Sequence, residues 1–385
     1  MINPFTPIME DLSQVGSYKR GVLIESHIAD LHFGAIDPAK QYRILEEQYL
    51  LTINSLPKLD IISVDGDIFD HKVMSNSDTA YYASLFIDNL IRIARNKNAT
   101  VIILHGTYSH DADQLKLFYH YVNDPTVDVR IVTTIQYVYA KGATILCIPE
   151  LYGVDEDIYR QFLFGSYYDE CFMHGTFHGA VYGDQTTSRL FHIEDFNHCF
   201  GPILAGHVHK PGCFDGYFYY CGTPIRYKFG EEEEKGHLIV MHDLDTHQHA
   251  VQFLPIKSFL YTTIDIDDII SNDPRVVIDY ITNLKNERGI DYIKIRFNSA
   301  VDGTNKSILM NHFRNNPYIN VEFLNKEQEK QKELEEQIYK DKEYGFVTDP
   351  KLTPEQKFCM YVNKKEGYEF ITVEKLQQIL SNDVF

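Results

Sequence analysis

The chain has 385 residues, of which 44% are hydrophobic, and a formal net charge of −19 at pH 7. This length predicts two or three folded units, and the apolar content excludes a disordered chain. No apolar run approaches the roughly 18 residues of a membrane helix, and the N-terminal segment lacks a signal-peptide pattern, so we expect a cytoplasmic protein. The acidic charge argues against a protein that grips nucleic acid through its own basic surface.

The first half of the chain alternates between strand-like and helix-like segments. Apolar runs predict strands at 21–29, 59–64 and 101–104, and helical spacing predicts helices at 41–54, 79–95 and 113–122. From residue 129 onward short strands predominate, at 135–140, 144–148, 171–174, 203–205, 218–221, 237–241 and 249–254. This order predicts an α/β fold in which helices cover sheets and ligands bind at the strand ends.

The second half begins at a predicted boundary near residue 255, so the first domain spans residues 1–255. Residues 256–326 have the pattern of a compact β-α-β-α-β unit, with strands at 260–266, 292–297 and 319–324 and helices at 274–285 and 304–314. Residues 327–385 would hold the rest of a charge-dense run and two C-terminal helices. Thr353-Pro354-Glu355-Gln356 has the pattern of a capping box, and Thr372 is the expected cap of the last helix.

Five short motifs follow strand-like runs in a fixed order. They are Asp30-Leu31-His32, Gly66-Asp67-Ile68-Phe69-Asp70, Ser109-His110-Asp111, His174-Gly175 and Gly206-His207-Val208-His209. Each is common by chance, and a lone histidine after a strand more often caps or packs than binds a metal. Their joint occurrence favours a two-metal site, because metal-assisted hydrolysis needs carboxylate and imidazole ligands and an open position for water.

The spacing within the motifs indicates how the ligands would converge. Asp30 and His32 are two residues apart, so they can reach one ion from a single turn, and His207 and His209 have the same spacing. Asp67 follows a glycine, which allows a close backbone approach. Asp67 is therefore the best candidate for a carboxylate that bridges two ions.

The order of these motifs resembles that of the calcineurin-like metallophosphoesterases. The resemblance narrows to the SbcD and Mre-eleven-type DNA repair nucleases through further strings, which are Cys221-Gly222-Thr223-Pro224-Ile225-Arg226, Phe229-Gly230-Glu231-Glu232 and Lys235-Gly236. It covers about residues 20–255, and the chain is similar to the short, divergent viral members. It implies a two-sheet sandwich with flanking helices, a small cap domain that recognises DNA ends, and C-terminal helices that dock a partner.

The resemblance also implies a metal centre with two divalent ions, manganese or alternatively magnesium. One ion would be held by Asp30, His32, Asp67 and His209, and the other by Asp67, His174 and His207. Asp70 is expected to hold a ligand in place rather than to bind an ion itself.

The third motif carries the implied acid and a departure from the family's pattern. His110 would face the scissile phosphate and protonate the leaving oxygen, with Asp111 orienting it. The family has Gly-Asn-His-Asp here, with the asparagine as a ligand of the second ion. Ser109 occupies the asparagine position, and two residues separate it from Gly106. We therefore expect a second ion that is held more weakly, completed by water, or helped by His105.

Two classes of function fit these features. As an enzyme, the chain would be a DNA exonuclease or endonuclease subunit that acts in recombination, repair or replication. An SbcC-type coiled-coil ATPase would supply the DNA grip that an acidic chain lacks, in a complex that contains a homodimer of this chain. The alternatives are a phosphodiesterase or phosphatase for a small substrate, which would not need the long C-terminal stretch, and a catalytically weakened DNA-binding scaffold. Only one expected ligand position is altered, which favours the enzyme.

Overall fold

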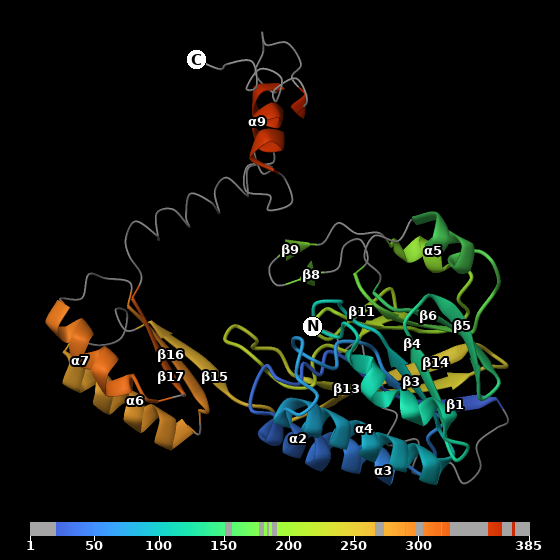
Figure 1. The fold of residues 1–385 in the computed structure, drawn as a ribbon, viewed down its shortest axis with the longest axis horizontal. Helices are drawn as coiled ribbons and strands as arrows, with labels where there is room; N and C mark the ends of the chain where they lie inside the picture. The colour runs from blue at the N-terminus through green and yellow to red at the C-terminus, as the bar shows by residue number, and fades with distance from the viewer. Residues whose placement is uncertain are drawn as a thin grey trace. The chain divides into compact units, whose positions relative to one another are not determined.

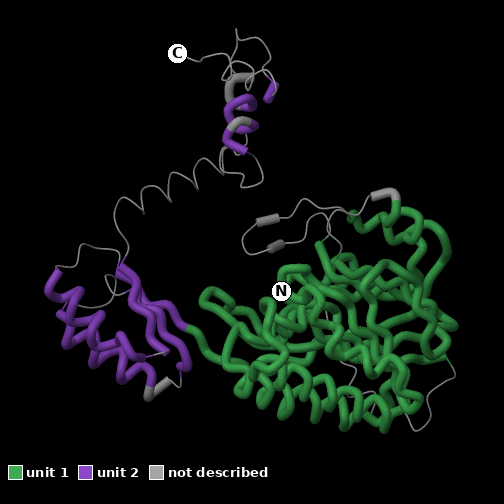
Figure 2. Tube along the Cα trace, in the orientation of Figure 1, with its two compact units in different colours: residues 1–261 green, residues 262–385 purple. Residues whose placement is uncertain are grey.

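The computed structural model describes residues 21–150, 156–176, 181–182, 185–186, 191–265, 273–288, 290–297, 303–316, 318–323, 353–363 and 372–373. The chain divides into two compact units, Met1–Tyr261 and Thr262–Phe385 (Figure 2). This division lies close to the predicted boundary near residue 255. Among the described residues, every helix is too short or too polar to span a bilayer.

The first sheet of unit 1 has six strands in the order β14-β13-β1-β2-β3-β4. Strands β1 to β4 are parallel, whereas β13 pairs antiparallel with β1 and with β14. The bounds are β1 Val22–Ile28, β2 Ile61–Val64, β3 Thr100–Leu104, β4 Asp128–Val132, β13 Gly236–Asp243 and β14 Gln248–Pro255. Strands β2 and β3 are apolar almost throughout because both faces of this sheet are covered.

The second sheet of unit 1 also has six strands, in the order β11-β12-β10-β7-β6-β5. The inner strands β6, β7, β10 and β12 are parallel, and β5 and β11 pair antiparallel at the two edges. The bounds are β5 Gln136–Ala140, β6 Ala143–Ile148, β7 Glu170–His174, β10 Ile203–Gly206, β11 Gly212–Phe214 and β12 Phe218–Tyr220. A separate two-stranded ribbon pairs β8 Val181–Tyr182 with β9 Gln185–Thr186.

Helices cover the outer faces of the two sheets (Figure 1). The first sheet packs against α2 Pro38–Leu45, η1 Glu46–Leu50, α3 Leu51–Ser55, α4 Asp78–Lys97 and η2 Gln114–Asn123. The second packs against α5 Glu156–Leu163 and η3 Ile193–Phe196. A third apolar cluster, which includes Ala29, Leu104, Phe172 and Val240, lies between the sheets. Unit 1 is thus a mixed α/β unit with two large mixed sheets, and the predicted α/β class is confirmed.

Two predicted helices differ in detail from the structure. The segment 41–54 begins earlier, at Pro38, where the Asp37 side chain accepts from the N–H of Lys40, and it includes the π-helical turn η1. The segment 113–122 forms the 3-10 helix η2. Over only ten residues, the apolar spacing of a 3-10 helix (3.0 residues per turn) is too similar to that of an α-helix (3.6) for the sequence to tell them apart.

Unit 2 contains a three-stranded sheet in the order β15-β16-β17. The elements alternate along the chain as predicted, as β15 Tyr261–Asp265, α6 Pro274–Arg288, β16 Tyr292–Phe297, α7 Gly303–Phe313 and β17 Ile319–Phe323. They share one apolar cluster, which includes Ile281, Ile295 and Leu309.

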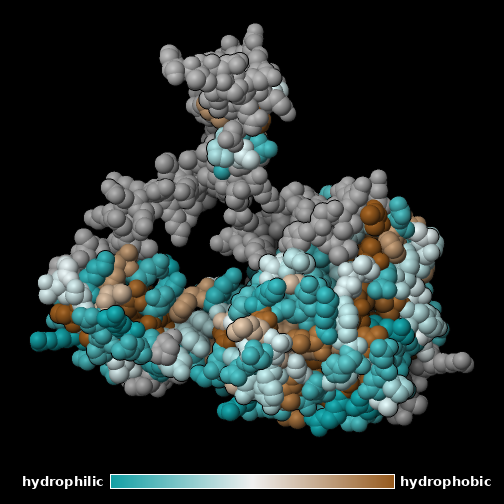
Figure 3. Space-filling view, in the orientation of Figure 1, coloured by the Kyte–Doolittle hydropathy of each residue, from teal (hydrophilic) through white to brown (hydrophobic). Residues whose placement is uncertain are grey.

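The C-terminal helix α9 spans Pro354–Asn363 and begins at the predicted capping box. The N–H of Thr353 donates to Gln356 Oε1 at 2.8 Å, and the N–H of Gln356 donates to Thr353 Oγ1 at 3.3 Å. The charged run at 325–342 and the helix predicted beyond residue 373 lie outside the described residues. On the face seen in Figure 3, hydrophilic side chains cover most of the described surface of both units.

Charged side chains are buried between the two sheets of unit 1. His27 on β1 lies with its Nδ1 3.0 Å from Asp65 Oδ2 and its Nε2 3.2 Å from Glu25 Oε2, and all three side chains are buried. On the facing sheet, Glu170 Oε1 lies 2.5 Å from His242 Nδ1. Burial alone would lower the pKa of His27, but Asp65 and Glu25 raise it to about 10. His27 is therefore a buried cation at neutral pH.

We expect His27→Gln to lower the free energy of unfolding by about 3–5 kcal/mol, because it leaves Asp65 as an uncompensated buried charge. The pKa of His27 is raised from 6.5 to about 10 in the folded state, so its contribution is fully present below pH 6.5 and is lost as the pH rises through 10. Urea unfolding at pH 7 and pH 10 would measure both effects. His120→Gln, at an exposed position, is the control; equal urea midpoints for both variants would contradict the prediction.

Candidate metal centre

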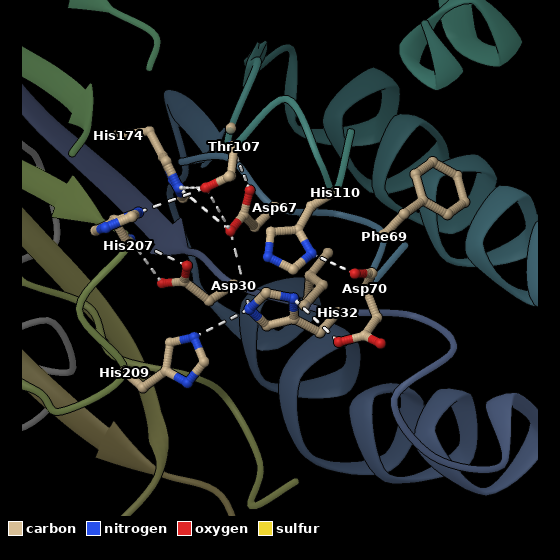
Figure 4. A network of polar contacts seen from close by, with 12 residues as sticks. Asp30, His32, Asp67, Phe69, Asp70, Thr107, His110, His174, His207 and His209 are labelled. Atoms are coloured by element: carbon tan, nitrogen blue, oxygen red, sulfur yellow. Dashed lines mark hydrogen bonds and ion pairs between the residues drawn. The ribbon is translucent and has the colours of Figure 1, made fainter. Parts of the chain in front are cut away.

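The predicted ligands lie where parallel strands of both sheets end. Asp30 follows β1 and Asp67 follows β2, whereas His174 ends β7 and His207 follows β10. The carboxyl ends of these strands meet at one side of the sandwich, so the side chains point toward one another (Figure 4). Three groups have potential ligand atoms within 4.8 Å of one another, and they are Asp30, His32 and His209; His32, Asp67 and His110; and Asp67, His174 and His207. All six ligands other than Ser109 that the motifs predict are therefore gathered at one place.

The backbone at these positions is strained. Asp30 (φ 52°), His32 (φ 44°), Asp67 (φ 53°) and His207 (φ 85°) all lie in the left-handed region, which non-glycine residues seldom occupy. Backbone hydrogen bonds between the loops after β1 and β2 hold this geometry. The N–H of Asp30 donates to Gly66 O and the N–H of His32 donates to Asp67 O, each at 3.0 Å. Such strain costs on the order of 1–3 kcal/mol per residue and clusters at functional sites.

Two glycines allow the ligands to approach. A Cβ atom at Gly66 would lie 2.2 Å from His174 Nδ1, and one at Gly106 would lie 2.2 Å from Asp67 Oδ1. Any side chain at either position would displace a ligand. Gly66 is therefore required for the close approach of the two sheets, and Gly106 for that of the loops after β2 and β3.

One side of the centre is formed by His32, His209 and Asp30. The Nε2 atoms of His32 and His209 face each other at 3.1 Å, and His32 Nε2 lies 3.9 Å from Asp67 Oδ2. Burial lowers the pKa of His32 to about 3, so its ring is neutral and has a lone pair for a ligand bond. Asp70 Oδ1 lies 3.7 Å from the other ring nitrogen, Nδ1 of His32. Asp70 thus lies close to the His32 ring, and its role in holding that ring in place stays a prediction.

The other side of the centre is formed by His174 and His207. His174 Nδ1 donates to the carbonyl oxygen of Asp65 at 2.6 Å, which directs its Nε2 toward Asp67 Oδ2 at 3.4 Å. Burial alone would lower the pKa of His174, but Asp67 raises it well above its usual value. Burial would likewise raise the pKa of Asp67, but His174 lowers it well below its usual range. The site therefore favours a positive charge between these residues, where a metal ion would lie.

The resemblance implied that Asp111 orients His110. In the structure, the Asp111 carboxylate instead binds backbone N–H groups of the loops that form the site, which corrects that role. It is fully buried and accepts from the N–H groups of Asp67 at 3.1 Å, Ile68 at 2.9 Å and Gly106 at 2.8 Å. The left-handed turn after β2 leaves these successive N–H groups without strand partners, so they need a buried acceptor. Burial raises the pKa of Asp111 to about 6 in spite of these bonds.

His110 is held by a backbone group instead. Its Nδ1 donates to the carbonyl oxygen of Asp70, and its ring lies edge-on to that of His32, with 4.8 Å between the centroids. The other ring nitrogen, Nε2, makes no recorded bond within the described part of the chain. His110 lines the open cavity of the site, so this nitrogen is available to a bound molecule.

The resemblance placed Ser109 at the position of the family's asparagine ligand. In the structure, Thr107 and not Ser109 lies beside Asp67, which corrects that placement. The N–H of Thr107 donates to Asp67 Oδ1 at 2.5 Å, and its Oγ1 lies 3.2 Å from Asp67 Oδ2 and 3.5 Å from His174 Nε2. Ser109 is exposed. The two extra residues of this loop follow Thr107 and form an outward turn, in which the N–H of His110 donates to Thr107 O at 2.9 Å. The residue directly after Gly106 therefore takes the asparagine position.

Glu150 is a residue of the site that the sequence motifs did not identify. It follows β6, and its Oε2 lies 3.0 Å from His207 Nδ1, 2.9 Å from Thr107 Oγ1 and 3.7 Å from His174 Nε2. Burial alone would raise the pKa of Glu150, but His207 lowers it overall, so it is a carboxylate. Its sequence signal was a carboxylate two residues after the apolar run at 144–148, separated from that run by Pro149.

His105 does not contact the ligands through any recorded bond. Its two ring nitrogens each lie 2.8 Å from a backbone carbonyl oxygen, that of Gly106 and that of Ala112. His105 therefore shapes the loop that carries Thr107 and Asp111.

Glu231 and Lys235, which belong to the sequence motifs that follow the first five, contact His209. Glu231 Oε1 lies 3.5 Å from His209 Nδ1, and the buried Lys235 donates from Nζ to His209 O at 3.0 Å. Burial alone would raise the pKa of Glu231, but His209 and Lys235 lower it to about 2. A carboxylate behind an imidazole in this way fixes the ring and increases its basicity as a ligand.

An open cavity of about 340 Å³ gives access to the centre. It is lined by His32, Asp67, Asp70, Thr107, His110, His207, His209, Tyr227, Lys228 and Glu231. The exposed Lys228 supplies a positive charge at this otherwise acidic and imidazole-rich surface. The cavity is large enough for a phosphate ester to reach both sides of the centre.

No known protein family matches the sequence, and no curated protein matches it. Several solved structures match, and one of them, a crystal structure, covers 60% of this chain and 99% of its own length, with 12% sequence identity and a TM-score of 0.34.

Proposed function

We propose that this chain is a two-metal phosphodiesterase of the calcineurin-like type, similar to the SbcD and Mre-eleven-type nucleases, and that it cleaves DNA at ends. The observation that supports this most is the place of Asp67. Its carboxylate belongs both to the group with His32 and His110 and to the group with His174 and His207. A carboxylate shared by two imidazole clusters is the arrangement that a bridging ligand requires.

The residues present fit manganese or magnesium. The carboxylate oxygens suit these ions, the imidazole nitrogens favour manganese over magnesium, and the described part of the site has no cysteine. The His174 ring has its tautomer fixed by the Asp65 carbonyl, as is usual for a metal-bound histidine. Two divalent ions held here would supply Lewis acidity and an activated water for attack on phosphorus.

The side chains around the cavity would do the remaining work. His110, with Nδ1 fixed by the Asp70 carbonyl, can hold a proton on Nε2 and deliver it to the leaving oxygen. Lys228 lies at the cavity and would attract a phosphate group. Asp111 keeps the loops that carry Asp67 and Thr107 in register, so its contribution is to position the site.

The substrate and partner assignments rest on the resemblance and on charge. The net charge of −19 means that a long DNA duplex needs a grip from another protein. An SbcC-type coiled-coil ATPase would supply it, in a complex with two copies of this chain that acts in recombination, repair or replication. The β15-β16-β17 sheet of unit 2, with α6 and α7, would be the part that selects DNA ends.

The proposed function is tested by supplying the purified full chain with manganese and three substrates. These are end-labelled linear duplex DNA, closed circular duplex DNA and a chromogenic phosphodiester. We expect cleavage of the linear DNA and slower hydrolysis of the chromogenic ester, both abolished by a chelator. Hydrolysis of the chromogenic ester alone would indicate a small-substrate phosphodiesterase. Manganese binding without hydrolysis of any substrate would indicate a scaffold.

A further inference from the structure

We propose that Glu150 is a ligand of the second metal ion, and that it and Thr107 together replace the amide ligand expected at this position. The inference rests on the proposed two-metal function and adds a carboxylate that no motif contains. It changes the expected chemistry of the second position, because a neutral ligand is exchanged for an anionic one.

Glu150 lies close to the residues that would hold the second ion, and not to those of the first. Its Oε2 faces His207 Nδ1 at 3.0 Å and His174 Nε2 at 3.7 Å. Among the described residues, it has no recorded contact with His32 or His209. Figure 4 shows Thr107, His174 and His207 on one side of Asp67, with His32 and His209 on the other. A ligand bond from Glu150 would therefore leave the first position unchanged.

The arrangement of donors and acceptors around Thr107 suits a bound cation. Thr107 Oγ1 lies 3.2 Å from Asp67 Oδ2 and 2.9 Å from Glu150 Oε2, but a hydroxyl has one proton and can serve only one of them. When His174 and His207 act as ligands, the nitrogens that face Glu150 carry no proton. Two carboxylate oxygens and two imidazole nitrogens then direct lone pairs toward one region. A divalent cation bound there would accept lone pairs from all four.

The second position would therefore have two carboxylates and two imidazoles, from Asp67, Glu150, His174 and His207. A more anionic set of oxygen ligands favours hard divalent ions such as manganese. The second ion is thus expected to bind firmly, contrary to the weak binding that Ser109 at the asparagine position suggested. We expect Glu150→Gln to weaken manganese affinity at this position by at least about 10- to 100-fold.

The test is manganese binding to the full chain, without substrate. Equilibrium dialysis should give two ions per wild-type chain and one per Glu150→Gln chain at the same free manganese concentration. Electron paramagnetic resonance should show a coupled ion pair only in the wild type. The matched control is Asp113→Asn, which removes an exposed carboxylate near the site, paired with Lys116 at 3.0 Å, and should retain two ions.

A rescue pair separates a ligand from a structural residue. In the Glu150→Gln background, Thr107→Asn supplies an amide oxygen beside Asp67 and should restore the second ion. Ser109→Asn in the same background should not, because that side chain is exposed. Melting temperatures of the metal-free variants should match that of the wild type, since Glu150 is needed for the ion and not for the fold.

The outcomes distinguish the two proposals. A wild-type chain that binds no manganese would overturn the proposed function. A wild type with two ions and a Glu150→Gln variant with two ions of equal affinity would overturn the role of Glu150 alone. Restoration by Ser109→Asn and not by Thr107→Asn would also overturn it, as would a large fall in melting temperature of the metal-free Glu150→Gln variant.

Discussion

Asp67→Asn is expected to reduce manganese-dependent DNA cleavage to background and to remove at least one bound ion. Asp67 Oδ2 lies 3.4 Å from His174 Nε2 and 3.9 Å from His32 Nε2, so its charge acts on both sides of the centre. A neutral amide cannot offset the charge of two ions. A loss of about 10³-fold in rate or more corresponds to at least ~4 kcal/mol of transition-state stabilisation. Cleavage rates with end-labelled DNA and dialysis with manganese would measure both effects.

The fold should survive this substitution. The amide oxygen of an asparagine can still accept the N–H of Thr107, as Asp67 Oδ1 does. Glu232→Gln, at an exposed position beside the Glu231 motif, is the control and should cleave at the wild-type rate. Wild-type turnover by pure Asp67→Asn protein would refute the two-metal proposal.

His110→Gln should lower the cleavage rate by about two to four orders of magnitude while both manganese ions stay bound. Glutamine can occupy a similar place but cannot transfer a proton to the leaving oxygen. His120→Gln, at an exposed position outside the motifs, should leave the rate unchanged.

Manganese stoichiometry decides between an acid and a ligand at this position. His110 belongs to the group with His32 and Asp67, whose ligand atoms lie within 4.8 Å of one another. If His110→Gln lost an ion as well as activity, His110 would be a ligand. If it lost neither, the proton donor would have to be sought among other groups at the cavity.

The order of elements and the ligand positions followed from local features of the sequence. The strands at 59–64 and 101–104 were predictable because apolar runs of that length must be buried on both faces. Helix α4 was predictable from its apolar spacing, whereas its cap, Ser77, came from the structure. The motifs at Asp30, Asp67 and His207 follow such strands directly, so the topology of parallel strands brought them together.

The third motif shows where local reasoning fails. An alignment anchored on His110-Asp111 assigns the asparagine position to Ser109, whereas one anchored on Gly106 assigns it to Thr107. Spacing alone does not decide between them, because the extra residues can be placed before or after the ligand. The hydrogen bond from the Thr107 N–H to Asp67 Oδ1 places Thr107 beside Asp67, so the alignment anchored on Gly106 is the correct one.

The sequence by itself determined the α/β class, the five histidine- and aspartate-bearing motifs and the strand ends at which they lie, since these depend on neighbours within a few residues. Only the tertiary structure decided that Glu150 and Thr107 meet, because they are 43 residues apart and lie on different sheets. The same holds for Asp111, whose partners are backbone N–H groups that become available only after two loops have packed together. Contacts of this kind depend on how the sheets stack, which no local pattern of residues encodes.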